Sequence, residues 1–117
     1  MKKIETYIVD SFTDQPFKGN PAGVCILKSK LSDSEMLSIA KELGLSETAF
    51  IGELNENNEY PIRFFSPVME IPLCGHATLA ASKVLFEIFP KMKKIHLENI
   101  QGLDLIIKKY GKIIEME

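Results

Sequence analysis

Residues 72–89 read PLCGHATLAASKVLFEIF, and this stretch decides the fold. A short turn containing Gly75 leads into a run that is apolar nearly all the way round and that stops before Pro90. A helix with apolar residues on every side is buried inside a domain rather than lying on its surface. The stretch therefore predicts a central helix over 76–89, with the rest of the chain wrapped around it.

A second helix is predicted upstream by its end signals. Ser32 and Glu35 have the spacing of a capping box, and Leu31 with Met36 can close a hydrophobic staple. Gly44 supplies a left-handed stop. The apolar residues between these signals lie on one face, which is typical of a helix that packs on a domain from outside.

The other segments predict strands, because they are short and rich in β-branched and aromatic residues. We expect strands at 3–10, 22–28, 47–53, 60–66, 94–99, 102–109 and 112–117. Gly102 and Gly111 mark turns, Pro61 should lie at a strand start or edge, and 66–75 is expected to be a turn. Strands around one central helix make an α+β domain.

Size and charge limit the classes of function. The chain has 117 residues, 45% of them hydrophobic, which suits a single globular domain. The net charge of −2 gives no attraction to nucleic acid or to an anionic membrane, and no apolar run approaches the ~20 residues of a membrane span. Two cysteines and no export signal at the start predict reduced thiols and a cytoplasmic location.

The first of three stretches that could carry chemistry is FKGNPAG at 17–23, which contains Asn20. Glycines on both sides of Asn20 and Pro21 let the backbone approach a ligand closely. The structural alternative is a plain loop between strands.

The second stretch is SETAF, which opens with Ser46 and Glu47 directly after the predicted helix stop. A carboxylate that begins an apolar strand is expected to be partly buried. Burial raises the pKa of a carboxyl group toward the range of a useful general acid or base. The alternative is an exposed glutamate at a strand end.

The third stretch is the turn before the central helix, with Cys74, Gly75, His76, Ala77 and Thr78. The amides at the start of a buried helix are suited to bind a carboxylate or an oxyanion. His76 can shuttle a proton, Thr78 adds a hydroxyl, and the helix dipole is expected to lower the pKa of the Cys74 thiol. The alternative is a capped core helix with a buried cysteine and a satisfied histidine.

Together these stretches resemble the PhzF-like family of phenazine biosynthesis. The resemblance rests on the order VDSFT, FKGNPAGVC, SETAF and RFFSPVMEIPLCGHATLA within residues 9–80. The tail IQGLDLIIKKYGKIIEME is similar to the strands that follow in that family. Each motif is weak alone, but their combination at this spacing is specific.

The resemblance implies one lobe of the diaminopimelate epimerase-like fold, a barrel-like mixed sheet around a central helix. The family's phenazine enzyme isomerises a small cyclic carboxylate by moving a proton, without a cofactor. The resemblance implies that Glu47 is catalytic and that Asn20, Ser46, Gly75 and His76 contact the substrate. Ala77 and Thr78 would complete the substrate-binding turn.

The resemblance also implies that residues 1–117 are only the N-terminal lobe of a two-lobed isomerase. The second lobe of the family supplies an aspartate and a glycine-rich loop to the site, so we expect the chain alone to be incomplete. An unpaired lobe would expose the inter-lobe face, which predicts a homodimer.

Two other functions stay open. A cysteine-dependent amino-acid epimerase or racemase of the same fold would use a thiol at about the position of Cys74. A single lobe could also bind a small anion without turning it over. The spacing of His76, His96, Cys25 and Cys74 predicts no metal site, and the sequence has no nucleotide-binding motif.

Overall fold

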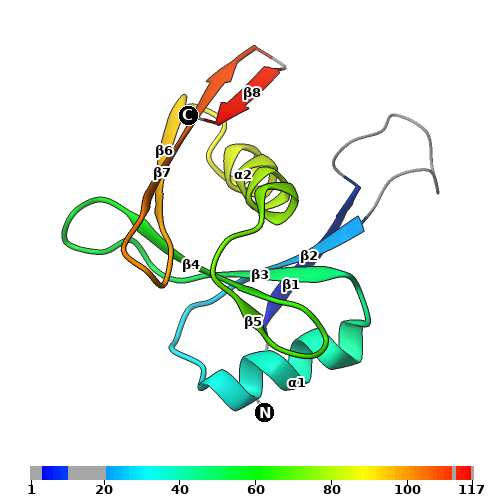
Figure 1. The fold of residues 1–117 in the computed structure, drawn as a ribbon. Coiled ribbons are helices and arrows are strands. Elements are labelled where there is room, and N and C mark those ends of the chain that lie inside the picture. Colours follow the sequence, from blue (N-terminus) through cyan, green and yellow to red (C-terminus); the bar gives the residue numbers. More distant parts are fainter. Residues whose placement is uncertain (1–3, 11–20, 112, 117) are drawn as a thin grey trace.

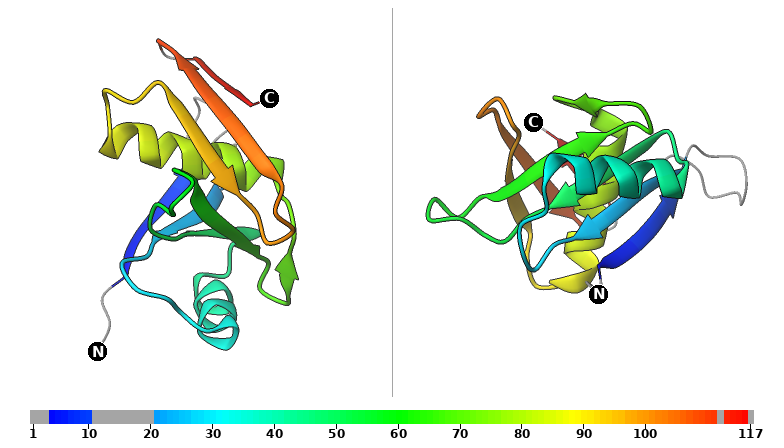
Figure 2. Two further views of the ribbon diagram at one scale, coloured as in Figure 1. Left: turned by 90° about the vertical axis from the view of Figure 1, so that its left-hand side faces the viewer. Right: turned by 90° about the horizontal axis from the view of Figure 1, so that it is seen from below.

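The central helix lies in the concave side of one curved, mixed sheet (Figure 1). The computed structural model describes residues 4–10, 21–111 and 113–116. Helix α2 (Gly75–Ile88) is enclosed by the sheet, and helix α1 (Asp33–Leu43) packs on the sheet's other face. The two views of Figure 2 show the same arrangement, with α1 and α2 on opposite sides of β2, β3 and β4. The expected α+β architecture is confirmed.

The described part of the sheet follows the order β1-β2-β3-β4-β6-β7-β8, with β5 paired to β4. Neighbours are antiparallel except β2 with β3 and β4 with β6, which are parallel. The strands are β1 Glu5–Asp10, β2 Pro21–Ile26, β3 Glu47–Ile51, β4 Tyr60–Phe65, β5 Glu70–Ile71, β6 Lys94–Glu98, β7 Asp104–Tyr110 and β8 Ile113–Met116. Each predicted strand is therefore present, within a few residues at its ends.

Helix α2 forms the core, as its composition predicts. Eight of its residues are buried, and they pack against the alternate residues of the strands that face them. Lys83 and Glu87 lie on the exposed stripe, which explains how a charged pair fits into an otherwise apolar helix. Among the described residues, no helix is long and apolar enough to cross a membrane.

Helix α1 has the ends that the sequence predicts. The Ser32 hydroxyl accepts a hydrogen bond from the Glu35 amide at 3.1 Å, and the Glu35 carboxylate accepts one from the Ser32 amide at 2.9 Å. Gly44 ends the helix with φ at 67°. The buried face of α1 packs on Cys25, Phe50 and Phe65, which forms a second, smaller core on the outer face of the sheet.

Gly23 allows α1 to pack closely against the sheet. A side-chain carbon at Gly23 would lie 3.1 Å from both Leu43 and Thr48, so a larger residue would push the end of α1 away. The sequence pattern predicts a close ligand approach for the glycines of this stretch. At Gly23 the structure gives a packing reason instead.

The expected turn at 66–75 contains a short strand that the sequence analysis missed. β5 pairs with the end of β4, and Glu70 on β5 accepts two hydrogen bonds from Arg63 on β4, at 2.6 and 2.8 Å. Two residues are too short for a period-2 pattern to show. Gly102 and Gly111, with φ at 79° and 60°, form the predicted turns. Asn20 lies outside the described residues.

The cap of α1 gives the first prediction. Ser32→Ala removes the oxygen that accepts the Glu35 amide, so the free energy of unfolding should fall by about 1 kcal/mol. Urea denaturation followed by circular dichroism measures this loss. Ser38→Ala, at an exposed position inside the same helix, is the matched control and should leave stability unchanged or slightly raised. Equal effects of the two substitutions would contradict a role for the cap.

Candidate functional site

Glu47 begins β3 and lies on the face of the sheet that holds α2. It alternates with Ala49 and Ile51, which both belong to the core around α2. The side chain is half-buried, and its Oε2 atom is inaccessible and has no hydrogen-bond partner among the described residues. A buried carboxylate oxygen without a partner is costly, so native proteins keep few of them and often at functional sites.

Cys74 lies at the N-terminus of α2 and takes the place of a capping side chain. Its backbone is extended, with φ at −144°, and its carbonyl accepts the first helical hydrogen bond from the Thr78 amide at 2.9 Å. The Cys74 side chain makes no cap hydrogen bond, but the backbone N–H groups of Ala77 and His76 lie near enough to its sulfur to lower the pKa of the thiol. The Glu47 carboxylate lies near enough to act on the same thiol.

The thiol of Cys74 differs from the sequence-based expectation. Burial raises the pKa of Cys74 above its ordinary value, and the negative charge of Glu47 raises it further. The two amides lower this pKa, but their effect is smaller than that of burial. The helix amides thus lower the pKa as expected, but burial and the Glu47 charge outweigh them, so the net shift of the thiol pKa is upward.

The other predicted residues lie in different surroundings. Ala77 and Thr78 are fully buried, and the Thr78 hydroxyl donates to the Cys74 carbonyl at 2.7 Å, inside the helix. Gly75 and Ser46 are exposed, and His76 is half-buried in the first turn of α2. A side-chain carbon at Gly75 would meet only Met116, at an ordinary 3.8 Å. Packing therefore does not require a glycine at this position.

Within the described ranges, no group of three or more histidine, cysteine or acidic residues is arranged to hold a metal ion. The groups available for chemistry at the candidate site are a carboxylate, a thiol, an imidazole and the helix amides. Such a set can move protons and can bind an anion.

Sequence reasoning missed two features. Asp10 ends β1 with a buried Oδ1 atom that has no hydrogen-bond partner among the described residues. Arg63 forms an ion pair with Asp33 of α1 at 2.9 Å in addition to its contacts with Glu70. In both cases the sequence shows a charged residue in an apolar strand. That pattern does not indicate which residue will be its partner.

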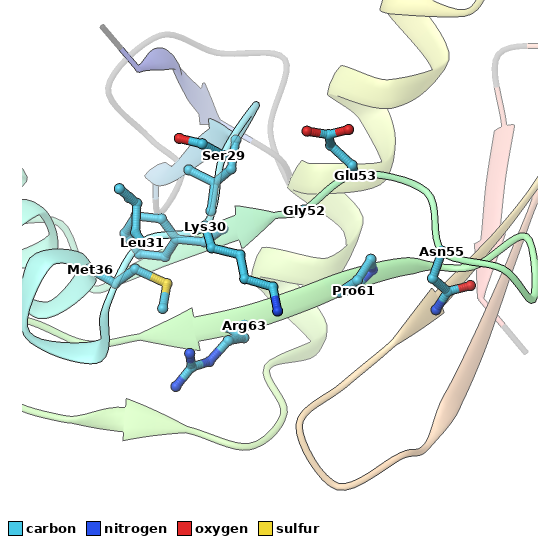
Figure 3. A pocket seen from close by; sticks show the side chains of 11 residues that line it. Ser29, Lys30, Leu31, Met36, Gly52, Glu53, Asn55, Pro61 and Arg63 are labelled. Atoms are coloured by element: carbon cyan, nitrogen blue, oxygen red, sulfur yellow. The ribbon is translucent and has the colours of Figure 1, made fainter. Parts of the chain in front are cut away.

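A pocket of about 610 Å³ lies elsewhere, on the outer face of the sheet (Figure 3). It is formed by the segment before α1, the start of α1, and strands β3 and β4. None of the predicted site residues that the structure describes lines it.

Comparison with known proteins gives a consistent result. The pattern that defines the phenazine biosynthesis-like (PhzC-PhzF) family matches residues 9–112. A phenazine biosynthesis-like domain-containing protein of Bos taurus is 47% identical over 100 residues, covering 80% of this chain and 34% of that protein. The Escherichia coli protein described as an uncharacterized isomerase, YddE, is 50% identical over 82 residues, covering 70% of this chain and 27% of that protein. The chain therefore spans about a third of the length of the curated relatives it matches.

Solved structures agree with these relatives. A phenazine biosynthesis PhzC/PhzF protein from Clostridium difficile matches with a TM-score of 0.88 and 43% identity, covering 97% of this chain and 43% of that one. A predicted epimerase from Pseudomonas aeruginosa, at 23% identity and a TM-score of 0.79, shares the fold. The expected diaminopimelate epimerase-like fold is confirmed.

The raised pKa of Cys74 gives the second prediction. At neutral pH the thiol is protonated, so iodoacetamide should alkylate Cys74 more slowly in the folded chain than in urea. Glu47→Gln removes a charge that raises this pKa and should speed the reaction. Each unit by which the pKa falls increases the thiolate population about tenfold. The gain in alkylation rate is smaller, because a thiolate of lower pKa is also a weaker nucleophile.

Mass spectrometry of the peptide that contains Cys74 separates its reaction from that of Cys25. Glu42→Gln, on the exposed face of α1, is the matched control and should leave the alkylation rate unchanged. An equal rate in Glu47→Gln and the unsubstituted chain would show that the carboxylate does not act on the thiol.

Proposed function

The chain belongs to the phenazine biosynthesis-like (PhzC-PhzF) family, and from this membership we propose that it forms one lobe of an isomerase acting on a small carboxylate. Glu47 moves a proton between two carbon atoms of the substrate as general base and then general acid. The reaction needs no cofactor, because one carboxyl group can accept the proton and return it. The description of a relative as an isomerase supports the reaction class.

The single observation that carries this proposal is the unpartnered, buried Oε2 atom of Glu47 beside the start of α2. A general base needs a lone pair that no protein donor already occupies, and it needs partial shielding from water. Glu47 has both properties on the face of β3 that carries α2. An exposed glutamate at a strand end, the structural alternative, would be hydrated on both oxygens.

The substrate carboxylate binds at the first amides of α2. Helix N-termini stabilise anions through their free N–H groups and the helix dipole. Gly75 is exposed and packing leaves its side-chain position open, so a ligand can approach its backbone closely. The Cys74 side chain makes no cap hydrogen bond, so it does not compete with an incoming carboxylate for the first N–H groups of α2.

Two alternatives are weaker. An epimerase in which Cys74 is the base needs a thiolate, and burial together with the Glu47 charge raises the pKa of this thiol. A lobe that only binds an anion would explain the amides of α2, but it leaves the buried oxygen of Glu47 without a role. His76 is a candidate to contact the substrate in either case.

A second lobe completes the site in this proposal. Among the described site residues, Gly75 and Ser46 are exposed and Glu47 and His76 are half-buried, so this side of the domain offers a surface that a second lobe would cover. Relatives are about three times as long as the matched part, which leaves room for another lobe to cover that surface. Asn20 and Ser46 would then contact the substrate. We place the protein in the cytoplasm, with reduced thiols.

We further propose that the chain forms a homodimer. Val68 and Met69, in the turn between β4 and β5, are 76% and 61% exposed. Leu73, Ile100 and Leu103 are also exposed, and the Asn99 side chain ties the β6–β7 turn to Pro72 at 3.0 Å. Large exposed apolar side chains favour association, and a twofold contact covers the same residues on both copies.

The third prediction tests Glu47 in a complete protein that contains this chain. Deuterium uptake from solvent by small cyclic and α-amino carboxylates, followed by NMR, reports proton transfer whatever the product is. Glu47→Gln should slow uptake by about 10²–10⁴-fold. Glu42→Gln should exchange like the unsubstituted protein. Unchanged uptake in Glu47→Gln would remove this residue from the mechanism.

The fourth prediction concerns association. Analytical ultracentrifugation should show a dimer of this 13.2 kDa chain, and Val68→Glu should shift the equilibrium toward the monomer, because it places a charge in the contact. Ile8→Glu, at an exposed apolar position of β1 outside these turns, is the matched control. A monomer at every concentration tested, with and without Val68→Glu, would refute the dimer.

A further inference from the structure

The pocket on the outer face of the sheet has the composition of a ligand site. Its volume of about 610 Å³ falls within the ~300–1,000 Å³ range of small-molecule pockets. Most of its lining is apolar and comes from elements that pack tightly together. The apolar residues are Leu27, Leu31, Met36, Phe50 and Pro61.

The walls of this pocket are rigid. Phe50 is buried and meets the ring of Phe65 edge-on at 5.5 Å, which fixes the floor. The Gly52 amide donates to the Pro61 carbonyl at 2.9 Å, which ties the β3 side to the β4 side. The capped first turn of α1 holds Met36 in place. A cavity with fixed walls binds ligands without the cost of ordering them.

Two cations border the pocket on one side. Arg63 uses Nε and Nη2 for Glu70 and Nη2 for Asp33, so those two carboxylates offset its charge. Lys30 has no ion pair within the described ranges and supplies the unbalanced positive charge. Figure 3 shows Lys30 reaching across the pocket toward β4, whereas the carboxylate of Glu53 points the opposite way.

We propose that this pocket binds a second small ligand, a monocarboxylate with an apolar body of about the size of one aromatic ring. The apolar body lies against Leu31, Met36 and Pro61. The carboxylate pairs with the Lys30 ammonium and accepts hydrogen bonds from the Nη1 atom of Arg63, which the contacts with Glu70 and Asp33 leave available. This site is separate from Glu47 and α2, which lie on the other face of the sheet.

The fifth prediction is tested by titrating the ¹⁵N-labelled chain with sodium benzoate and recording amide shifts by NMR. The amides of Gly52 and Asn55, which line the pocket, should shift and saturate. Benzyl alcohol and benzylamine have the same ring but no carboxylate, so they should bind at least tenfold more weakly, as expected for loss of about one charge-assisted contact. Equal binding of the three compounds would overturn the proposal.

Two variants locate the site. Lys30→Gln should weaken benzoate binding about tenfold, while Lys28→Gln, an exposed lysine outside the pocket, should not change it. Gly52→Val should weaken binding without changing charge. Its Cβ would sit at an ordinary 3.6 Å from Pro61, so the position has room for the first side-chain atom, and the added methyl groups take up the part of the cavity next to Pro61.

The outcome also separates this pocket from the site at α2. Shifts at Gly75 and His76 alone, with none at Gly52, would refute the outer pocket and leave the proposed function untouched. Shifts at Asn55 that persist undiminished in both Lys30→Gln and Gly52→Val would also refute it. Loss of exchange activity in Glu47→Gln has no bearing on this result.

Discussion

The sheet can curve into its half-barrel only because α2 is apolar on almost every side. Six buried apolar residues of this helix belong to one core with strands from both halves of the sheet, so the strands close around it. The exposed residues of the helix are at its two ends and on the stripe with Lys83 and Glu87. Because a buried helix cannot reach water along its length, its free amides become the natural place for an anion.

Strand β3 separates two kinds of chemistry by alternation. Glu47 and Ala49 lie on the face of the sheet that packs against α2. Phe50 lies on the opposite face and forms the floor of the outer pocket. The period of two residues thus places the proposed proton-transfer residue on one face and the proposed ligand pocket on the other. A shift of one residue in register would exchange the two faces, so the pairing of β3 with β2 and β4 fixes both sites together.

Much of this fold could be predicted from local signals, and the misses have physical causes. The ends of α1 followed from Ser32, Glu35 and Gly44 because a cap is encoded within four residues. β5 was missed because two residues are too few to show a periodic pattern. Backbone pairing with β4 and the hydrogen bonds from Arg63 to Glu70 hold this strand in place. The net upward shift of the Cys74 pKa did not follow from the turn alone, because it depends on burial and on a residue 27 positions away in the sequence. The motifs identified the family and the candidate residues. They did not show which hydroxyl or amide groups already form hydrogen bonds within the fold.

The two helices differ in how their N-termini are satisfied, and this difference bears on function. α1 has a full capping box and two acidic residues in its first turn, which is the arrangement that maximises stability. α2 has no side-chain oxygen at its cap and no acidic residue in its first turn. The side chain of its cap residue Cys74 makes no cap hydrogen bond, and a thiol is a weak acceptor. Departures from the most stable local choice are expected where a ligand supplies the missing interaction. Burial is the main cause that keeps the Cys74 thiol neutral, so the thiol adds no charge at the positive end of α2, where the proposed substrate carboxylate would bind beside the proposed base Glu47.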